Sequence, residues 1–144
     1  MFLDASAIIA ILNDEPEAEG FQNAIEAHTR KVIVSPLARF EAIVSLAASR
    51  SKKRKAQTTA EAIELATQSV DALLQEVEAT EVAILATIGE KALAAAATYG
   101  RVVGHPADLN FGDCFAYAVA KAYREPILSK GDGFTKTDLK AVST

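Results

Sequence analysis

The sequence predicts an α/β fold: one domain over residues 1–144, with a mostly parallel central sheet of about four to five strands flanked by helices. Short apolar runs rich in β-branched residues recur along the chain, and helical patterns separate them. Parallel strands need crossover connections, which are usually helical. The chain has 144 residues, one cysteine and 50% apolar residues, so one domain can bury a sufficient core without disulfides or structural metal.

The first elements follow from local patterns. An apolar run at residues 2–4 leads into a helical stretch at residues 6–12, which indicates a buried strand running into a helix. Residues 14–17 combine a proline with acids, which favour the start of a helix, so we expect a second helix to about residue 29. Residues 32–34 are a β-branched run and predict the next strand.

Ser35 and Pro36 begin a third helix, for which we expect this apolar stripe: Leu37, Phe40, Val44 and Ala47. The basic stretch at residues 49–56 covers the helix end and a turn. The remaining elements are expected in this order: helix 57–75, strand 76–80, helix 81–99, loop 100–106, helix 111–123, strand 127–129 and a last strand at 141–143. Asp108 or Asn110 caps the helix that begins at residue 111.

Several acids lie where parallel strands end or helices are apolar. Functional grooves in such sheets lie beyond the carboxyl ends of the strands, and Asp4 directly follows the first strand. Glu41 lies in an apolar helix, where a carboxylate is costly to bury unless it is paired or binds a cation. Asp113 lies in the first turn of a helix that is apolar on almost every side. Asp132 follows the strand at 127–129, and Asp138 is a further acid on the same segment.

Each acid also has a purely structural explanation. Asp4 is placed to cap the helix after it. Glu41 has basic residues nearby as ion-pair partners. Asp113 gains under about 1 kcal/mol at the positive end of a helix dipole, and Asp132 lies in a Gly-Asp-Gly turn. Both explanations stay open at the level of the sequence.

Brought together, Asp4, Glu41, Asp113 and either Asp132 or Asp138 predict a metal site. Clustered carboxylates repel one another unless positive charge compensates them. An all-oxygen ligand set favours Mg²⁺, with Mn²⁺ as a substitute, over zinc. Such ions activate water and stabilise in-line displacement at a phosphate. The other candidate groups are expected to be structural or surface residues: His28, His105, Cys114 and Tyr117.

The distribution of charge changes what the net charge of -4 indicates about partners. Residues 28–55 contain eight basic residues and one acid, a charge of +7, whereas the rest has 7 bases against 18 acids, a charge of -11. Nucleic-acid binding depends on Lys and Arg that neutralise phosphates. The stretch Arg50 to Lys55 therefore either steers a nucleic acid electrostatically or is a solvated helix end.

The sequence has no feature of a secreted or membrane protein. The apolar start carries Asp4 and no preceding basic residue, and no apolar run approaches the ~18 residues of a membrane span. We therefore expect a cytoplasmic protein without membrane contact.

These residues resemble the PIN-domain ribonuclease toxins of the VapC type. The resemblance rests on Phe-Leu-Asp4-Ala-Ser6-Ala, on Glu41, on the stretch Leu109-Asn110-Phe111-Gly112-Asp113-Cys114-Phe115, and on Lys130-Gly131-Asp132-Gly133-Phe134 followed by Thr137-Asp138. Its motifs occur in the expected order along the whole chain.

The resemblance implies a PIN fold and a Mg²⁺- or Mn²⁺-dependent endoribonuclease that acts often on transfer or ribosomal RNA. It also implies a homodimer and a cognate VapB-type antitoxin of a type II toxin-antitoxin system. Asp4, Glu41 and Asp113 match the family's best-defined acids, and Ser6 matches the hydroxyl residue that supports the first of them. The fourth acid departs from the family pattern, because Gly133 precedes the phenylalanine and the acid lies one position earlier, at Asp132.

Two other functions fit parts of the sequence. An aspartyl-phosphate-type Mg²⁺-dependent phosphatase also starts with a strand that ends in Asp, but it needs an acid two residues later, where this chain has Ser6. In a non-catalytic interaction module, the acids would only cap helices and pair with basic residues.

Overall fold

Five short parallel strands form the centre of the computed structural model, which describes residues 1–142. Their order in the sheet is β3-β2-β1-β4-β5, with β1 in the middle. The strands are β1 (Phe2–Leu3), β2 (Ile33–Val34), β3 (Thr80–Glu81), β4 (Ile127–Leu128) and β5 (Ala141–Val142). Phe2 pairs with Ile33 on one side and Ile127 on the other, and all three are buried. The predicted α/β class with a parallel sheet is confirmed.

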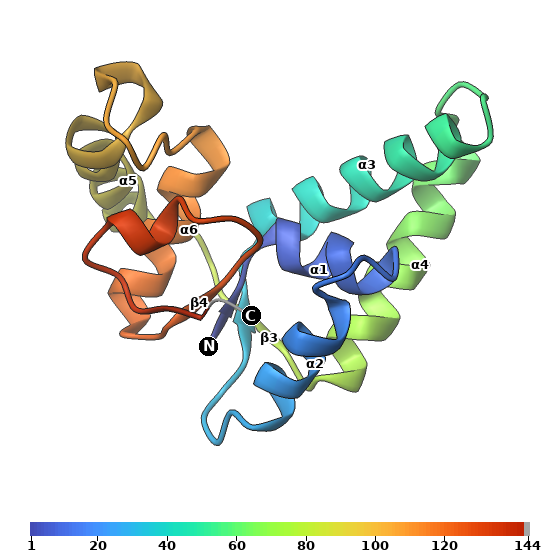
Figure 1. Ribbon diagram of the computed structural model, residues 1–144, viewed down its shortest axis with the longest axis horizontal. Helices are drawn as coiled ribbons and strands as arrows, with labels where there is room; N and C mark the ends of the chain where they lie inside the picture. The colour runs from blue at the N-terminus through green and yellow to red at the C-terminus, as the bar shows by residue number, and fades with distance from the viewer. Residues whose placement is uncertain (143–144) are drawn as a thin grey trace.

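Within residues 1–142, six helices surround the sheet in two groups. They are α1 (Ala5–Leu12), α2 (Ala18–Glu26), α3 (Pro36–Lys53), α4 (Ala60–Glu76), α5 (Ala86–Tyr99) and α6 (Phe111–Tyr123), with short 3-10 turns η1 (Arg101–Val103) and η2 (Phe134–Lys136). Helices α3 and α4 pack on each other, as do α5 and α6. In Figure 1 these two pairs diverge as two arms on opposite sides of the sheet.

Side-chain caps explain where several helices begin. Ser35 accepts a hydrogen bond from the Ala38 N–H, and Pro36 occupies the first turn of α3, where its missing N–H costs nothing. Asn110 caps α6, as one of the two predicted candidates. The other candidate, Asp108, forms an ion pair with Arg101 instead.

Several predicted boundaries are wrong because tertiary pairing overrides the local pattern. The second helix begins at Ala18 rather than at residue 14, and α5 begins at Ala86 rather than at residue 81. Helix α4 continues through Glu76, so the strand starts only at Thr80, whose N–H donates to the Val32 carbonyl. Of the predicted last strand, Ser143 lies outside the described residues.

The predicted apolar stripe of α3 is also partly wrong. Phe40 is 63% exposed and Val44 37% exposed, whereas Ala38, Ala42 and Leu46 are buried. Helix α3 packs against α1 and α4, so its buried face is the one that carries small residues and allows close approach. The exposed Phe40 leaves apolar surface beside Glu41. Across residues 1–142, no helix combines the length and the apolar character needed to span a membrane.

Candidate active site

Asp4 lies directly after β1 and is buried, with a relative exposure of 7%. Its Oδ2 accepts hydrogen bonds from the Ser6 N–H at 3.0 Å and from the Ser6 hydroxyl, so Asp4 caps α1. Burial raises the pKa of Asp4, and the Ser6 hydrogen bonds oppose this rise only in part. Ser6 Oγ also accepts the Lys130 N–H at 3.0 Å, which ties the start of α1 to the loop after β4.

Asp113 is held in the first turn of α6 by a reciprocal capping box. The Asn110 N–H donates to Asp113 Oδ2 at 2.8 Å, and the Asp113 N–H donates to Asn110 Oδ1 at 2.9 Å. This arrangement leaves Asp113 Oδ1 without a hydrogen-bond donor among residues 1–142. Burial raises the pKa of the Asp113 carboxyl, which the Asn110 hydrogen bond opposes. The side chain is therefore oriented while one oxygen stays available.

Glu41 reaches the same place from α3. Burial raises its pKa, and the carboxylates of Asp4 and Asp113 raise it further. Within the described part of the chain it forms no ion pair and accepts no hydrogen bond, so the basic partner that a structural explanation required is not found there. Gly112 packs beside it: a Cβ atom added at Gly112 would lie 2.5 Å from Glu41 Oε2. The sheet therefore brings three carboxylates together from β1, α3 and α6.

Asp132 and Asp138 lie outside this group. Neither contributes to the raised pKa values of Asp4, Glu41 and Asp113. Asp132 is exposed and pairs with Lys136 at 2.8 Å, which lowers its pKa. Asp138 accepts hydrogen bonds from the Tyr117 hydroxyl and from Lys121 Nζ. The Asp132 loop still borders the site, because the Lys130 N–H two residues earlier binds Ser6.

The donor chemistry of the three acids fits a hard divalent cation. All donors are carboxylate oxygens, the preferred ligands of Mg²⁺ and Mn²⁺. The three carboxylates repel one another, and no basic side chain among residues 1–142 pairs with Glu41 to offset this repulsion. A bound cation would supply the missing positive charge. As they stand, no three His, Cys, Asp or Glu side chains of residues 1–142 form a metal-holding cluster, so binding an ion would draw the carboxylates closer together.

The remaining candidates have structural roles, as expected. His28 lies near Glu125, and Nδ1 of His105 accepts the Ala107 N–H. Cys114 is a buried free thiol. The buried Tyr117 donates its hydroxyl proton to Asp138, at the flank of α6.

Sequence reasoning missed the role of Gly112. A glycine in the first turn of an otherwise apolar helix weakens the helix, and such a position often marks a close approach. Here the approaching group is the Glu41 carboxylate. The glycine is visible in the sequence, but the sequence does not reveal which group approaches it, because α3 and α6 are far apart along the chain.

Comparison with known proteins identifies the family. Residues 1–140 match the PIN domain family. A VapC ribonuclease of Rhizobium meliloti (strain 1021) is 44% identical over 143 residues, which cover 96% of this chain and 98% of the relative. Ribonuclease VapC30 of Mycobacterium tuberculosis (strain ATCC 25618 / H37Rv) is 35% identical over 144 residues, covering 99% of this chain and 98% of the relative.

Two solved structures share the fold at low sequence identity. The crystal structure of Mycobacterium tuberculosis VapC20, a Sarcin-Ricin loop cleaving toxin, aligns with a TM-score of 0.69 and 15% identity, covering 99% of this chain and 98% of the other. A toxin-antitoxin complex from Klebsiella pneumoniae aligns with a TM-score of 0.63 and 17% identity, covering 99% and 95%. With its parallel sheet, its three acids from the end of β1, from α3 and from α6, and these full-length relatives, the chain belongs to the VapC group of the PIN domain family.

Proposed function

We propose that this protein is a metal-dependent endoribonuclease and the toxin of a type II toxin-antitoxin system. The observation that carries the proposal is the group of three acids with raised pKa values, Asp4, Glu41 and Asp113, in a chain related over its full length to VapC ribonucleases. Uncompensated carboxylates destabilise a fold, so their retention at one edge of the sheet favours a functional site.

Asp4 and Asp113 are the principal metal ligands in this proposal, with Glu41 as a further ligand or as the group that orients the attacking water. A bound Mg²⁺ or Mn²⁺ supplies an activated water and stabilises negative charge at the phosphate. Ser6 holds Asp4 through Oδ2, and Asn110 holds Asp113 through Oδ2. Glu41, which lacks a hydrogen-bond partner in residues 1–142 and has a raised pKa, is suited to accept a proton from water at a carboxylate oxygen.

Asp132 is the proposed fourth acid, with Asp138 as its substitute. The support for Asp132 is its place on the loop whose Lys130 N–H contacts Ser6. Its pair with Lys136 is exposed, so it is readily exchanged for another cation.

The proposed substrate is RNA, of the transfer or ribosomal class, and the proposed regulator is a cognate VapB-type antitoxin. The name of the VapC20 structure, a Sarcin-Ricin loop cleaving toxin, supports a ribosomal target, and the Klebsiella pneumoniae toxin-antitoxin complex supports an antitoxin partner. Because such RNA is intracellular, we place the activity in the cytoplasm.

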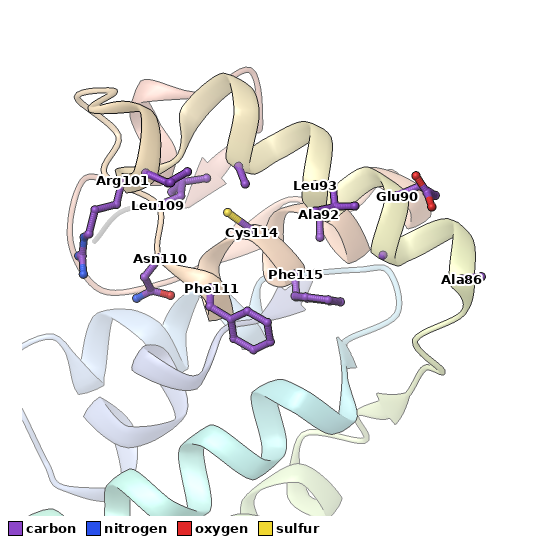
Figure 2. A pocket seen from close by; sticks show the side chains of 13 residues that line it. Ala86, Glu90, Ala92, Leu93, Arg101, Leu109, Asn110, Phe111, Cys114 and Phe115 are labelled. Atoms are coloured by element: carbon purple, nitrogen blue, oxygen red, sulfur yellow. The ribbon is translucent and has the colours of Figure 1, made fainter.

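Homodimerisation is supported by apolar surface between α5 and α6. Phe111 and Phe115 of α6 and Leu93 of α5 are among the residues that line one groove (Figure 2). Leu93 is 68% exposed and Phe111 71% exposed, and the groove has a volume of about 870 Å³. Exposed apolar side chains that line one groove are typical of interaction sites. If a second copy of the chain covers this groove, Leu93→Glu should disrupt the dimer and give the mass of a monomer in light scattering. The control Leu65→Glu, on the exposed surface of α4, should keep the mass of the dimer.

Cleavage of bulk tRNA and rRNA, with and without Mn²⁺, tests the activity. Asp4→Asn and Asp113→Asn should each slow cleavage at least a hundredfold, because each removes an ionised ligand. Asp71→Asn, which removes an acid of α4 that is paired with Arg39 and is not one of the three site acids, is the matched control. Wild-type rates in both folded site variants would rule out the carboxylate site. Metal-dependent hydrolysis of p-nitrophenyl phosphate without RNA cleavage would indicate the phosphatase alternative.

A further inference from the structure

The C-terminal end of α3 carries four consecutive basic residues, Lys52, Lys53, Arg54 and Lys55, which we call the basic tip. All four are exposed. In Figure 1 the turn between α3 and α4 forms the free end of one arm, far from the sheet. The acid site described above makes no use of these residues.

The basic tip is distinctive because it gathers, in consecutive residues, four charges that are unpaired in the described part of the chain. Ion pairs neutralise six other basic side chains: Arg30, Arg39, Arg101, Lys121, Lys130 and Lys136. Within residues 1–142, none of the four tip side chains forms an ion pair. The predicted +7 segment is thereby divided, since Arg30 binds Glu125 and Arg39 binds Asp71, while the tip keeps its full charge.

The backbone holds the basic tip in one conformation. The Lys55 N–H donates to the Lys52 carbonyl and the Ala56 N–H to the Ser51 carbonyl, which is the hydrogen-bond pattern of a Schellman helix end. Lys55 takes the left-handed position, with φ of 55°, where glycine is usual. A lysine at this position adds a charge that a glycine would not.

Arg50 anchors the arm rather than adding to the free charge. Its Nη1 donates to Ser69 Oγ of α4 at 3.0 Å, and its Nη2 donates to the Leu12 carbonyl of α1 at 3.2 Å. These bonds join α3 to both neighbouring helices. The tip is therefore a preorganised set of cations, which loses less conformational entropy on binding than a mobile tail.

A single helix joins the basic tip to the acid site. Glu41 and Lys53 are both on α3, twelve residues apart. At about 1.5 Å per residue the separation along the helix axis is about 18 Å. A stacked nucleic-acid strand has about 3.4 Å per phosphate, so this distance corresponds to about five nucleotides.

We propose that the basic tip binds the phosphate backbone of the RNA substrate about five nucleotides from the scissile bond. This inference rests on the proposed ribonuclease function. The ligand class follows from the side chains, since residues 49–60 have four free cations but no aromatic residue on which bases stack. The tip therefore adds affinity without reading the base sequence.

Binding of a fluorescein-labelled RNA of about 24 nucleotides, measured by anisotropy across a salt series, tests the proposal. The tip variant is Lys52→Gln, Lys53→Gln, Arg54→Gln and Lys55→Gly. The matched control is Lys31→Gln, Lys91→Gln, Lys140→Gln and Arg124→Gly, which removes the same charge from exposed residues without ion pairs in the described chain. Like Lys55, Arg124 has a left-handed backbone conformation. It precedes β4, so it lies toward the amino ends of the parallel strands, whereas Asp4 follows the carboxyl end of β1.

At about 50 mM salt the tip variant should bind at least about tenfold more weakly than the control, with a slope of log affinity against log salt smaller by about three. In cleavage it should raise KM and leave kcat unchanged. Equal affinities and slopes in the two variants would overturn the inference, as would failure of wild type to bind the probe.

Lys55→Gly alone provides a test that misfolding does not affect, because glycine suits the backbone there. It should lower RNA affinity about twofold or more without lowering the melting temperature; an unchanged affinity would contradict the proposal. The binding assay needs no cleavage. A wild-type protein that binds RNA through the tip but cuts none would therefore overturn the proposed function and leave only the phosphate-binding role of the tip standing.

Discussion

Gly112 of α6 lies against the carboxylate of Glu41 on α3, so close that a Cβ atom at position 112 would come 2.5 Å from Glu41 Oε2 and 3.3 Å from Cδ. No real Cβ atom is accommodated at such distances unless the neighbour moves. The neighbour is the end of a flexible side chain, so the movement is cheap for folding. The movement would, however, displace the Glu41 carboxylate from its position in the site.

Gly112→Ala should therefore separate stability from activity. Alanine stabilises a helix interior by up to about 1 kcal/mol relative to glycine, so the melting temperature should hold or rise. Displacement of Glu41 should slow RNA cleavage about tenfold or more. Gly89→Ala is the control, because a Cβ there, also within a helix, meets nothing within 4 Å. Full activity in Gly112→Ala would show that the position of Glu41 does not matter.

The raised pKa values predict that neutralising Asp113 stabilises the metal-free protein. The folded state holds the Asp113 proton more tightly than the unfolded state, so ionisation above the ordinary pKa of 3.8 progressively destabilises the fold. Asp113→Asn keeps an oxygen that accepts the Asn110 N–H and removes the charge. Thermal melts without divalent ions should show a higher melting temperature for Asp113→Asn at about pH 7, with the difference shrinking as the pH falls toward 3.8. A lower melting temperature at neutral pH would contradict this.

Addition of Mn²⁺ should stabilise the wild type through the same carboxylates. A ligand that binds only the folded state stabilises it by about 2.7 kcal/mol at a hundred times its Kd. Asp4→Asn and Asp113→Asn should show much smaller increases in melting temperature, measured by differential scanning fluorimetry. Asp71→Asn should respond as wild type does. Equal increases in all four proteins would place the ion elsewhere.

Substitution of Asp132 should affect cleavage, whereas substitution of Asp138 should affect stability. Asp138→Asn weakens the contacts with Tyr117 and Lys121, so it should lower the free energy of unfolding by about 1 kcal/mol and spare cleavage. Asp132→Asn should slow cleavage, by less than Asp113→Asn does, without a measurable change in urea unfolding, because its pair with Lys136 is exposed. If Asp138→Asn slows cleavage and Asp132→Asn does not, the fourth acid is Asp138.

Glu125 should be the acid whose loss most destabilises the fold. It is buried just before β4, at the amino ends of the strands. Burial alone would raise the pKa of Glu125, but the Met1 ammonium and Arg30 hold this pKa below the ordinary 4.5. Its contribution is therefore present above pH 4.5 and is lost as the pH falls through the lowered value. Glu125→Gln should cost roughly 2 to 4 kcal/mol in urea unfolding at neutral pH, because it leaves the buried Met1 ammonium without its carboxylate partner. The exposed Glu26→Gln is the control, and equal stability of the two variants would show that the pairing contributes nothing.

The sequence predicts the bounds of an element correctly where capping residues and turns next to that element set them. The helix over residues 111–123 has the predicted bounds, because the Asn110 cap and the turn after Tyr123 are both local features. The local pattern does not locate the strand at Thr80–Glu81, because hydrogen bonds to β2 decide where it starts. It also assigns Phe40 and Val44 wrongly to the core, because the partners of α3 select which apolar face is buried.

By itself the sequence determined the α/β class, the order of the elements and which acids are out of place among apolar neighbours, since these depend on residue type and spacing. Only the tertiary structure decided which of those acids meet. The strand order places Asp4 at the centre of the sheet, α3 and α6 bring Glu41 and Asp113 beside it, and Asp132 and Asp138 are engaged by lysines instead. The tertiary structure also decided which cations of the basic segment are neutralised: Arg30 and Arg39 form ion pairs, whereas residues 52–55 form none within residues 1–142. Ion pairing depends on distance in space, which the sequence does not specify.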